Sequence, residues 1–425
     1  MLNTTSRRSR LLQRLHAARA QTGALFGMVE PAFLFQRPIS ERHRLAFYIG
    51  HLESFDWNLL SSPLGLSSER EVLDKLFAFG IDPVDGALPS DRLSDWPALE
   101  TFFRYRDQTR AELDAALDRS DRKLDEMRID QLLEVAIEHR LMHAETLSYL
   151  LHQMPFHAKR GSTTHGDRAM RAVTPQTVRV PAGRTILGLS ASSGKFGWDN
   201  EFEAHTVDVP AFVIDKYKVT NEQYLAFLND GGYSRREFWD EEDWAWREAH
   251  AIGQPAFWLQ QDGAWLWRSM FDAIPLPRNW PVYVSHAEAS AYACWAGRAL
   301  PTEAQWQRAA FGADEVVVND DVAGNSPRFD PFAVDDPGLI ASGPFPVVGM
   351  RRNGWEWTSS VFAPFAGFRP FDFYPGYSEP FFDGKHFVLK GGSVRTAASM
   401  LRPSFRNWFQ PHYPYVYAGF RCVDR

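Results

Sequence analysis

The sequence predicts a protein of two domains, a helical domain followed by a domain that mixes α and β structure. At 425 residues the chain is longer than one ordinary hydrophobic core supports. Through residue 158, apolar side chains recur at the three-to-four spacing of helices. Beyond residue 172, short apolar runs alternate with turns rich in Gly, Pro, Asn and Asp. We therefore expect an α domain over residues 1–158, a linker over 159–172 and an α+β domain over 173–425.

Four helical runs account for the first domain. The first covers residues 11–22, and the second follows Ser40, whose side chain suits an N-cap. The third covers residues 98–117, and the fourth starts near Ser120 and continues until Pro155 stops it. Connections of moderate length between four helices favour a four-helix bundle, and the core of such a bundle is a usual place for metal ligands.

The second domain begins after a polar stretch rich in Gly, Ser and Thr. Helical spacing returns there only over residues 220–228, 287–297 and 302–311. The chain has 15 Trp, 32 Phe and 13 Tyr, and they are denser after about residue 195. Such side chains bury large areas and also line pockets for flat or cationic ligands. We expect α+β structure with many irregular segments.

Composition excludes several classes of function. The net charge of -7 argues against nucleic acid as a partner, because binding phosphates needs concentrated positive charge. Two cysteines are too few for a disulfide scaffold and fit the reducing cytoplasm. The basic segment 7–14 lacks the apolar core of a secretory signal, and no apolar stretch is long enough to span a bilayer. We expect a cytoplasmic protein.

The fourth helical run contains a pair of histidines at metal-binding spacing. His139 and His143 are four residues apart, so on a helix both rings lie on one face and can reach the same ion. Glu145 is expected to hydrogen-bond one of these rings from outside the coordination sphere and to fix its orientation. The pattern is not His-Glu-x-x-His, so the general base of a zinc protease is missing between the rings.

A third ligand should come from another helix of the bundle. The candidates are His16, His43, His51 and His152. His51 lies in a strongly apolar run, where an unpaired imidazole would be costly, and we select it. Three neutral imidazoles leave open positions on the ion. Iron(II) would use them for O2 and substrate, zinc would suggest hydrolysis, and spacing alone does not decide between the two.

Motifs along the whole chain resemble one enzyme family. His51 with its neighbours in 50–55, followed by His139-x-x-x-His143-x-Glu145, resembles the DinB-like four-helix bundle of the ergothioneine-type sulfoxide synthases. The second half resembles their partner domain, which is related to the formylglycine-generating enzyme and has a C-type-lectin-like fold. The motifs that carry this second resemblance are 219–224 (VTNEQY), 298–306 (RALPTEAQW), 353–360 (NGWEWTSS), 391–393 (GGS) and 419–421 (GFR).

The resemblance implies a mononuclear non-haem iron(II) site that uses O2 to join sulfur, or in one branch selenium, to C2 of the imidazole of hercynine. It makes His51, His139 and His143 the iron ligands. It also makes Asn407 and Trp408 part of the hercynine-binding segment. A quaternary ammonium donates no hydrogen bond, so aromatic faces and carbonyl dipoles suit it. We expect the metal and this segment to meet in a cleft between the domains.

Four positions depart from the family pattern and bear on the substrate. Met142 replaces a glutamine that contacts the hercynine carboxylate. Phe409 replaces the acidic residue of branches that use γ-glutamylcysteine. Phe362 and Phe365 stand in a segment where one branch has a tyrosine that donates a proton, and 77–81 lacks the Tyr-Tyr pair of another branch. The catalytic acid is therefore unknown.

These departures resemble the selenoneine synthases, whose donor is a selenosugar, and cysteine-using sulfoxide synthases are the alternative. Three other classes remain open. A DinB-like zinc thiol transferase needs only the bundle, and a non-catalytic lectin-like binding module needs only the second domain. Formylglycine generation requires active-site cysteines that bind copper, and Cys294 and Cys422 lie in the wrong motifs.

Overall fold

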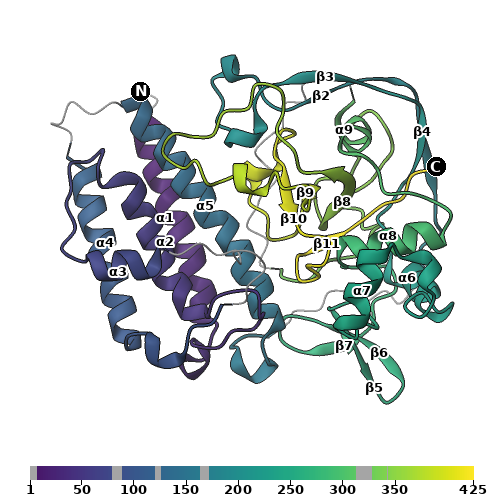
Figure 1. Ribbon diagram of the computed structural model, residues 1–425, viewed down its shortest axis with the longest axis horizontal. Helices are drawn as coiled ribbons and strands as arrows, with labels where there is room; N and C mark the ends of the chain where they lie inside the picture. Colours follow the sequence, from purple (N-terminus) through teal and green to yellow (C-terminus); the bar gives the residue numbers. More distant parts are fainter. Residues whose placement is uncertain (1–6, 79–88, 120–125, 163–171, 313–327, 342) are drawn as a thin grey trace. The chain divides into compact units, whose positions relative to one another are not determined.

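The computed structural model describes residues 7–78, 89–119, 126–162, 172–312, 328–341 and 343–425. The chain forms two compact units, Met1–Ser162 and Thr163–Arg425, here called the helical unit and the second unit. Together they give a mixed α and β architecture (Figure 1). Most of the expected linker, residues 163–171, lies outside the described residues, as do residues 79–81 of the aromatic segment compared above.

The described residues of the helical unit form four long helices and one short helix, whose arrangement Figure 1 shows. The helices are α1 (Arg7–Gly27), α2 (Leu45–Leu60), α3 (Glu71–Phe77), α4 (Leu99–Leu117) and α5 (Glu126–Gln153). Helix α1 packs along α5, and α2 packs against both α4 and α5. Most side chains of α2 are buried, as expected for a helix that is covered on all its faces.

Two expectations about this unit were wrong. Ser40 is not the N-cap of the second helix, because α2 begins at Leu45. The backbone N–H groups of Leu45 and Ala46 donate to the carbonyls of Gln36 and Leu34, so the preceding loop rather than a side chain satisfies them. Helix α3 was missed because a seven-residue helix is too short to show a periodic apolar pattern. The expected start of the fourth helix, residues 120–125, lies outside the described residues.

In its described residues, the second unit combines small sheets with four α-helices. Its strands are β1 (Thr177–Val180), β2 (Gly183–Leu187), β3 (His205–Val209), β4 (Phe212–Asp215), β5 (Trp258–Gln261), β6 (Ala264–Arg268), β7 (Ala273–Pro275), β8 (Gly354–Val361), β9 (Phe387–Gly392), β10 (Asn407–Phe409) and β11 (Ala418–Gly419). Its helices are α6 (Asn221–Asn229), α7 (Glu241–Ala249), α8 (His286–Trp295) and α9 (Glu303–Phe311). Capping boxes start three of them, at Thr220, Ser285 and Thr302.

Strands of this unit form a four-stranded sheet of order β10-β9-β8-β11. Strand β9 is antiparallel to both β8 and β10, with Trp408 opposite Val388, while β11 runs parallel to β8. This pairing fixes the position of the segment that contains Asn407 and Trp408. Among the described residues, no helix combines the length and the apolarity that crossing a membrane requires.

Candidate metal centre

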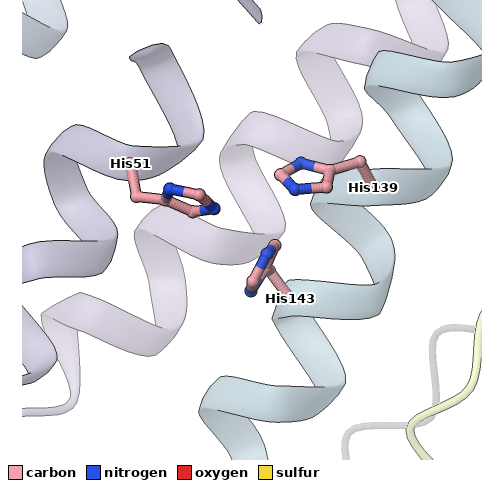
Figure 2. Close-up of side chains that lie close together, drawn as sticks. All are labelled: His51, His139 and His143. Atoms are coloured by element: carbon pink, nitrogen blue, oxygen red, sulfur yellow. The ribbon is translucent and has the colours of Figure 1, made fainter. Parts of the chain in front are cut away.

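Three histidine side chains converge inside the helical unit. His51 comes from α2, and His139 and His143 come from successive turns of α5, with the rings turned toward one another (Figure 2). One ring nitrogen from each lies within 4.8 Å of the others. The ring centroids are 5.5 Å apart for His51 and His139, 5.1 Å for His51 and His143, and 4.5 Å for the α5 pair. Each residue is at most 6% exposed. We call these residues the histidine trio.

The hydrogen bonds of the trio leave nitrogen atoms open. The Nδ1 of His51 lies 2.8 Å from the carbonyl oxygen of Phe77. Because that oxygen can only accept, Nδ1 carries the proton and donates it, and Nε2 keeps its lone pair. This Nε2, together with the Nδ1 atoms of His139 and His143, is buried without a hydrogen-bond partner among the described residues. Such atoms are costly unless a ligand completes them.

Glycine at position 50 makes the Phe77 contact possible. A Cβ on Gly50 would come within 2.4 Å of the Phe77 ring, so only glycine lets the end of α3 lie this close to α2. The approach brings the Phe77 carbonyl to the ring of His51. Sequence reasoning missed this partner, although the Gly50-His51 pair in a buried helix was a signal that another backbone lies near.

Aromatic side chains of α2 pack against each ring of the trio. Phe55 stacks on His139 with 3.4 Å between centroids, and Phe47 stacks on His51 at 4.9 Å. The ring of Tyr48 lies 5.7 Å from that of His143. These contacts restrict ring rotation, so the nitrogen atoms are oriented before any ligand binds. Tyr48 also places a phenol-bearing side chain beside the trio, which the sequence did not indicate.

Burial keeps the trio uncharged. Removal from water lowers the pKa of His51 to about 4 and lowers the pKa values of His139 and His143 well below the usual histidine value. Neutral imidazoles are the form that binds metal ions. Three neutral nitrogen donors, oriented and lacking other partners, are compatible with a divalent transition metal ion.

The remaining histidine candidates lie outside this cluster. His16 is 58% exposed and lies 3.6 Å from Asp114. His43 is half-buried and packs on Phe47, and His152 is fully buried near the end of α5. None of them belongs to the cluster that the described residues form.

Met142 and Glu145 flank His143 on α5. Met142 is half-buried, and Glu145 is buried. Among the residues that the structure describes, the Nδ1 atoms of His139 and His143 have no hydrogen-bond partner, so the Glu145 carboxylate does not orient either ring through that atom. The hydrogen-bond partner that the structure does show for a ring of the trio is the Phe77 carbonyl, which accepts from His51. The role expected of Glu145 stays a prediction.

The residues expected to hold hercynine share strand β10 of the second unit. Trp408 is half-buried, with its ring stacked on Phe362 at 4.2 Å and 7°. The ring of Tyr377 meets it edge-on at 5.3 Å. The side-chain oxygen of Asn407 accepts a hydrogen bond from the backbone of Trp408, which fixes the direction of the amide dipole. The indole and the amide are thus held together on one short strand.

Three phenylalanines of the second unit are among the positions where this chain departs from the resemblance. Phe409 stacks on Tyr413 with 5.3 Å between centroids and 5° between planes. Phe362 is buried beneath Trp408. Phe365 lies 4.1 Å from the Arg406 guanidinium. Tyr377 is the tyrosine that these contacts bring against Trp408, and sequence reasoning had not ranked it above other tyrosines.

Comparison with known proteins places these residues in context. Residues 163–425 match the family of the sulfatase-modifying factor enzyme 1-like domain. The hercynine oxygenase of Mycolicibacterium thermoresistibile is 36% identical over 68% of this chain and 69% of that protein. The hercynine oxygenase of Mycobacterium tuberculosis is 37% identical over 56% of this chain and 58% of that protein. Ergothioneine biosynthesis protein 1 of Neurospora crassa is 27% identical over 92% of this chain and 55% of that protein.

The coverage of these matches differs between the units. The family domain begins at residue 163, so an alignment over 92% of the chain also includes most of the helical unit. The chain spans only 55% to 69% of the length of these relatives. Similarity therefore extends over both units, while part of each relative has no counterpart here.

Proposed function

We propose that this chain, which belongs to the family of the sulfatase-modifying factor enzyme 1-like domain, joins selenium to C2 of the hercynine imidazole. A relative of the chain is named a hercynine oxygenase. The relatives are named as enzymes of hercynine and ergothioneine metabolism, and the chain is an oxidative enzyme of the same kind. The observation that carries the proposal is the histidine trio: one ring nitrogen of each histidine lies within 4.8 Å of the others, and each ring has a buried nitrogen without a hydrogen-bond partner among the described residues.

The proposal gives each unit a role. We assign the helical unit to the DinB-like bundles and the second unit to the C-type-lectin-like fold, with the boundary inside residues 159–172. His51, His139 and His143 hold iron(II). The bound ion supplies one-electron chemistry with O2. The residues around it orient the ligand rings and exclude water.

Binding of hercynine is assigned to Asn407 and Trp408. The trimethylammonium group of hercynine needs an aromatic face and an oriented carbonyl dipole. The Trp408 ring is held in place by Phe362, and the Asn407 amide is held by the Trp408 backbone. Phe409 is a further proposed substrate contact on the same strand, and the substrate contact expected of Met142 on α5 stays a prediction. Holding both reactants lowers the entropy cost of the reaction by several kcal/mol.

The molecule that donates selenium or sulfur is the more detailed part of the proposal. An amino-bearing dipeptide would need a carboxylate at position 409, whereas Phe409 stacks on Tyr413 and offers an apolar surface. We therefore favour a selenosugar, with cysteine as the alternative donor. Joining the reactants breaks the C2–H bond and the Se–H bond of the donor and forms one C–Se bond. The two electrons and two protons released would reduce O2 to hydrogen peroxide. We propose Tyr377 as the proton donor, because its ring lies against Trp408.

Parallel single-turnover reactions test the proposal. The protein is loaded with iron(II) without oxygen, mixed with hercynine and either a selenosugar selenol or cysteine, and then exposed to O2. Mass spectrometry should find the hercynine–selenium adduct in the first reaction and much less product in the second. A Tyr377→Phe variant should bind hercynine normally and slow the reaction.

Two results would contradict the proposal at different levels. Turnover with cysteine and not with the selenosugar would move the chain to the sulfoxide synthase alternative. If the protein retains zinc, shows no spectrum of an iron–nitric oxide complex and forms neither product, the result would support the zinc thiol transferase instead. Metal analysis of the protein as purified, with the nitric-oxide probe, distinguishes these cases.

A further inference from the structure

Arg140 lies next to His139 in the sequence and is fully buried. Its guanidinium makes four hydrogen bonds, and all four acceptors belong to α2. They are the backbone carbonyl of Leu52 at 3.0 Å, both carboxylate oxygens of Glu53 at 3.0 Å and Asp56 Oδ2 at 2.6 Å. The acceptors begin at the residue directly after His51. The immediate neighbours of two trio members are therefore bonded to each other.

The same cluster reaches the other two long helices. Arg110 of α4 donates to Glu53 Oε1 at 2.7 and 3.1 Å. Arg19 of α1 lies 3.8 Å from Asp56 Oδ2 and donates to Asp114 of α4 at 2.7 Å. Five buried or half-buried charged side chains thus join α1, α2, α4 and α5 at the level of the trio. We call this group the Arg140 cluster: Arg19, Glu53, Asp56, Arg110 and Arg140.

The energetics of buried ions bear on what this cluster does. Replacing a buried ion cluster by apolar side chains is often neutral or stabilising, because desolvation offsets the attraction between the charges. Net stability is therefore a poor reason for so many buried charges. The geometry of the cluster is a better reason for the buried charges, since the planar guanidinium group can bond its partners in only a few arrangements. A guanidinium bonded to Leu52, Glu53 and Asp56 at once fixes how α5 is rotated and shifted against α2.

We propose that Arg140 is a positioning residue for the histidine trio. Successive helical residues point about 100° apart, so His139 and Arg140 meet α2 at two separate points. Two points of contact define the register of α5 against α2. The apolar contacts of α2 alone do not define it. This register brings His51 opposite the α5 pair. The inference rests on the proposed metal site and adds the device that holds the site in shape.

Cobalt(II) titration tests the inference, because the ligand-field spectrum of cobalt reports affinity and coordination geometry without turnover. Arg140→Lys keeps the charge and loses the fork. We expect cobalt affinity to fall about 10–100-fold, the range seen when outer partners of metal ligands are removed, with an altered spectrum. Glu53→Gln should act in the same direction. The double variant should lose less than the product of the two single losses, because both changes break the same contact.

Arg421→Lys in the second unit is the matched control. Arg421 is also fully buried and donates to a buried carboxylate, Glu356, but it belongs to the other unit. It should lower stability and leave cobalt binding unchanged. All titrations are made below the melting temperature of each variant, followed by circular dichroism. If Arg140→Lys does not fold, Glu53→Gln carries the test.

The outcomes separate this inference from the proposed function. Wild-type protein that binds no cobalt would remove the metal site itself, and the positioning role with it. Wild-type binding, together with equal affinity and an unchanged spectrum in the folded Arg140 and Glu53 variants, would overturn the positioning role and leave the metal site standing. A drop in affinity with Arg421→Lys as large as that with Arg140→Lys would show a general loss of stability and would also overturn it.

Discussion

The two units each bury a cluster of ionisable side chains, and the clusters differ in whether their polar atoms have partners. In the second unit, Glu356 accepts from Lys218 at 2.7 Å through one oxygen and from Arg421 at 2.8 Å through the other. The remaining donors of Lys218 and Arg421 reach backbone carbonyls. We call these three residues the Glu356 cluster. In the histidine trio, by contrast, one nitrogen of each ring has no partner within the part of the chain that the structure describes.

The difference fits a structural role for the Glu356 cluster and a binding role for the histidine trio. Burial acts to raise the pKa of Glu356, but Arg421 and Lys218 outweigh it and lower the pKa below the usual value. The carboxylate is charged and its partners are complete, so it has no capacity left for a ligand. The trio has that capacity. Glu356 and Arg421 belong to motifs by which the chain resembles its family, and these motifs therefore hold the fold together.

Removal of one trio member should have the largest effect and should act on metal binding alone. His139→Ala should abolish stoichiometric metal binding, a loss beyond the roughly 100-fold upper range for an outer partner. His139→Leu, which replaces a partnerless polar ring by an apolar group, should keep the stability of the metal-free protein. Metal content and urea unfolding measure the two effects. His16→Ala, on an exposed histidine, is the control. Full metal content in His139→Ala would contradict the proposed site.

Removing the charge of Glu356 should have the opposite effect: it should lower stability and leave metal binding unchanged. Glu356→Gln leaves two buried cations without their carboxylate, so unfolding free energy should fall by about 3–5 kcal/mol. Metal content should not change. Glu222→Gln, in a pair with Arg278 that is 44% and 34% exposed, should cost under about 1 kcal/mol. Urea unfolding followed by tryptophan fluorescence compares the two variants. A loss as small as that of the control would mean that the cluster is not structural.

A change at Trp408 tests whether substrate binding is separate from metal binding. Trp408→Ala removes an aromatic face worth about 1–2 kcal/mol to a desolvated cation, so hercynine affinity should fall about 5- to 30-fold. Metal content should stay at the wild-type level. Calorimetric titration with hercynine gives the affinity. Trp246→Ala changes another half-buried tryptophan of the same unit and should not affect it. Equal loss of metal and hercynine in Trp408→Ala would refute the separate roles.

The parts of the site that follow from helix geometry could be predicted from the sequence. His139 and His143 share a face because four residues make about one turn. His51 was selected because its neighbours are apolar, and the structure brings its ring to the other two. Similarity to the known relatives agrees with the ergothioneine-type family. The donor and the role of Glu145 are not fixed by any of these observations.

The parts that depend on distant backbone could not be predicted. The carbonyl of Phe77 reaches His51 because α3 docks at Gly50, and the segment before α3 shows no periodic pattern that places it there. Arg140 stands between two histidines, where a charged side chain is expected to face solvent, and its partners on α2 lie more than 80 residues away. The sheet order β10-β9-β8-β11 includes a parallel pair, which no local signal specifies.

In the number of its hydrogen-bond partners, Asp199 is intermediate between the Glu356 cluster and the histidine trio. The prediction for Asp199 has the smallest expected effect. Ser378 donates to one carboxylate oxygen, and the other is buried without a partner among the described residues. Burial raises the pKa of Asp199 from 3.8 to about 6. Between these values the folded protein binds more protons than the unfolded chain, so stability falls as the pH rises from about 4 to 6.

Asp199→Asn removes this titration with little change in shape. The variant should match wild type near pH 4 and exceed it by about 1–2 kcal/mol at pH 7.5. Urea unfolding at both pH values measures the difference, with the exposed Asp262→Asn as the control. A variant that is less stable than wild type at pH 7.5 would mean that the carboxylate is fully paired when ionised. Asp199 would then belong with Glu356, and an open buried oxygen would lose its value as a sign of a binding site.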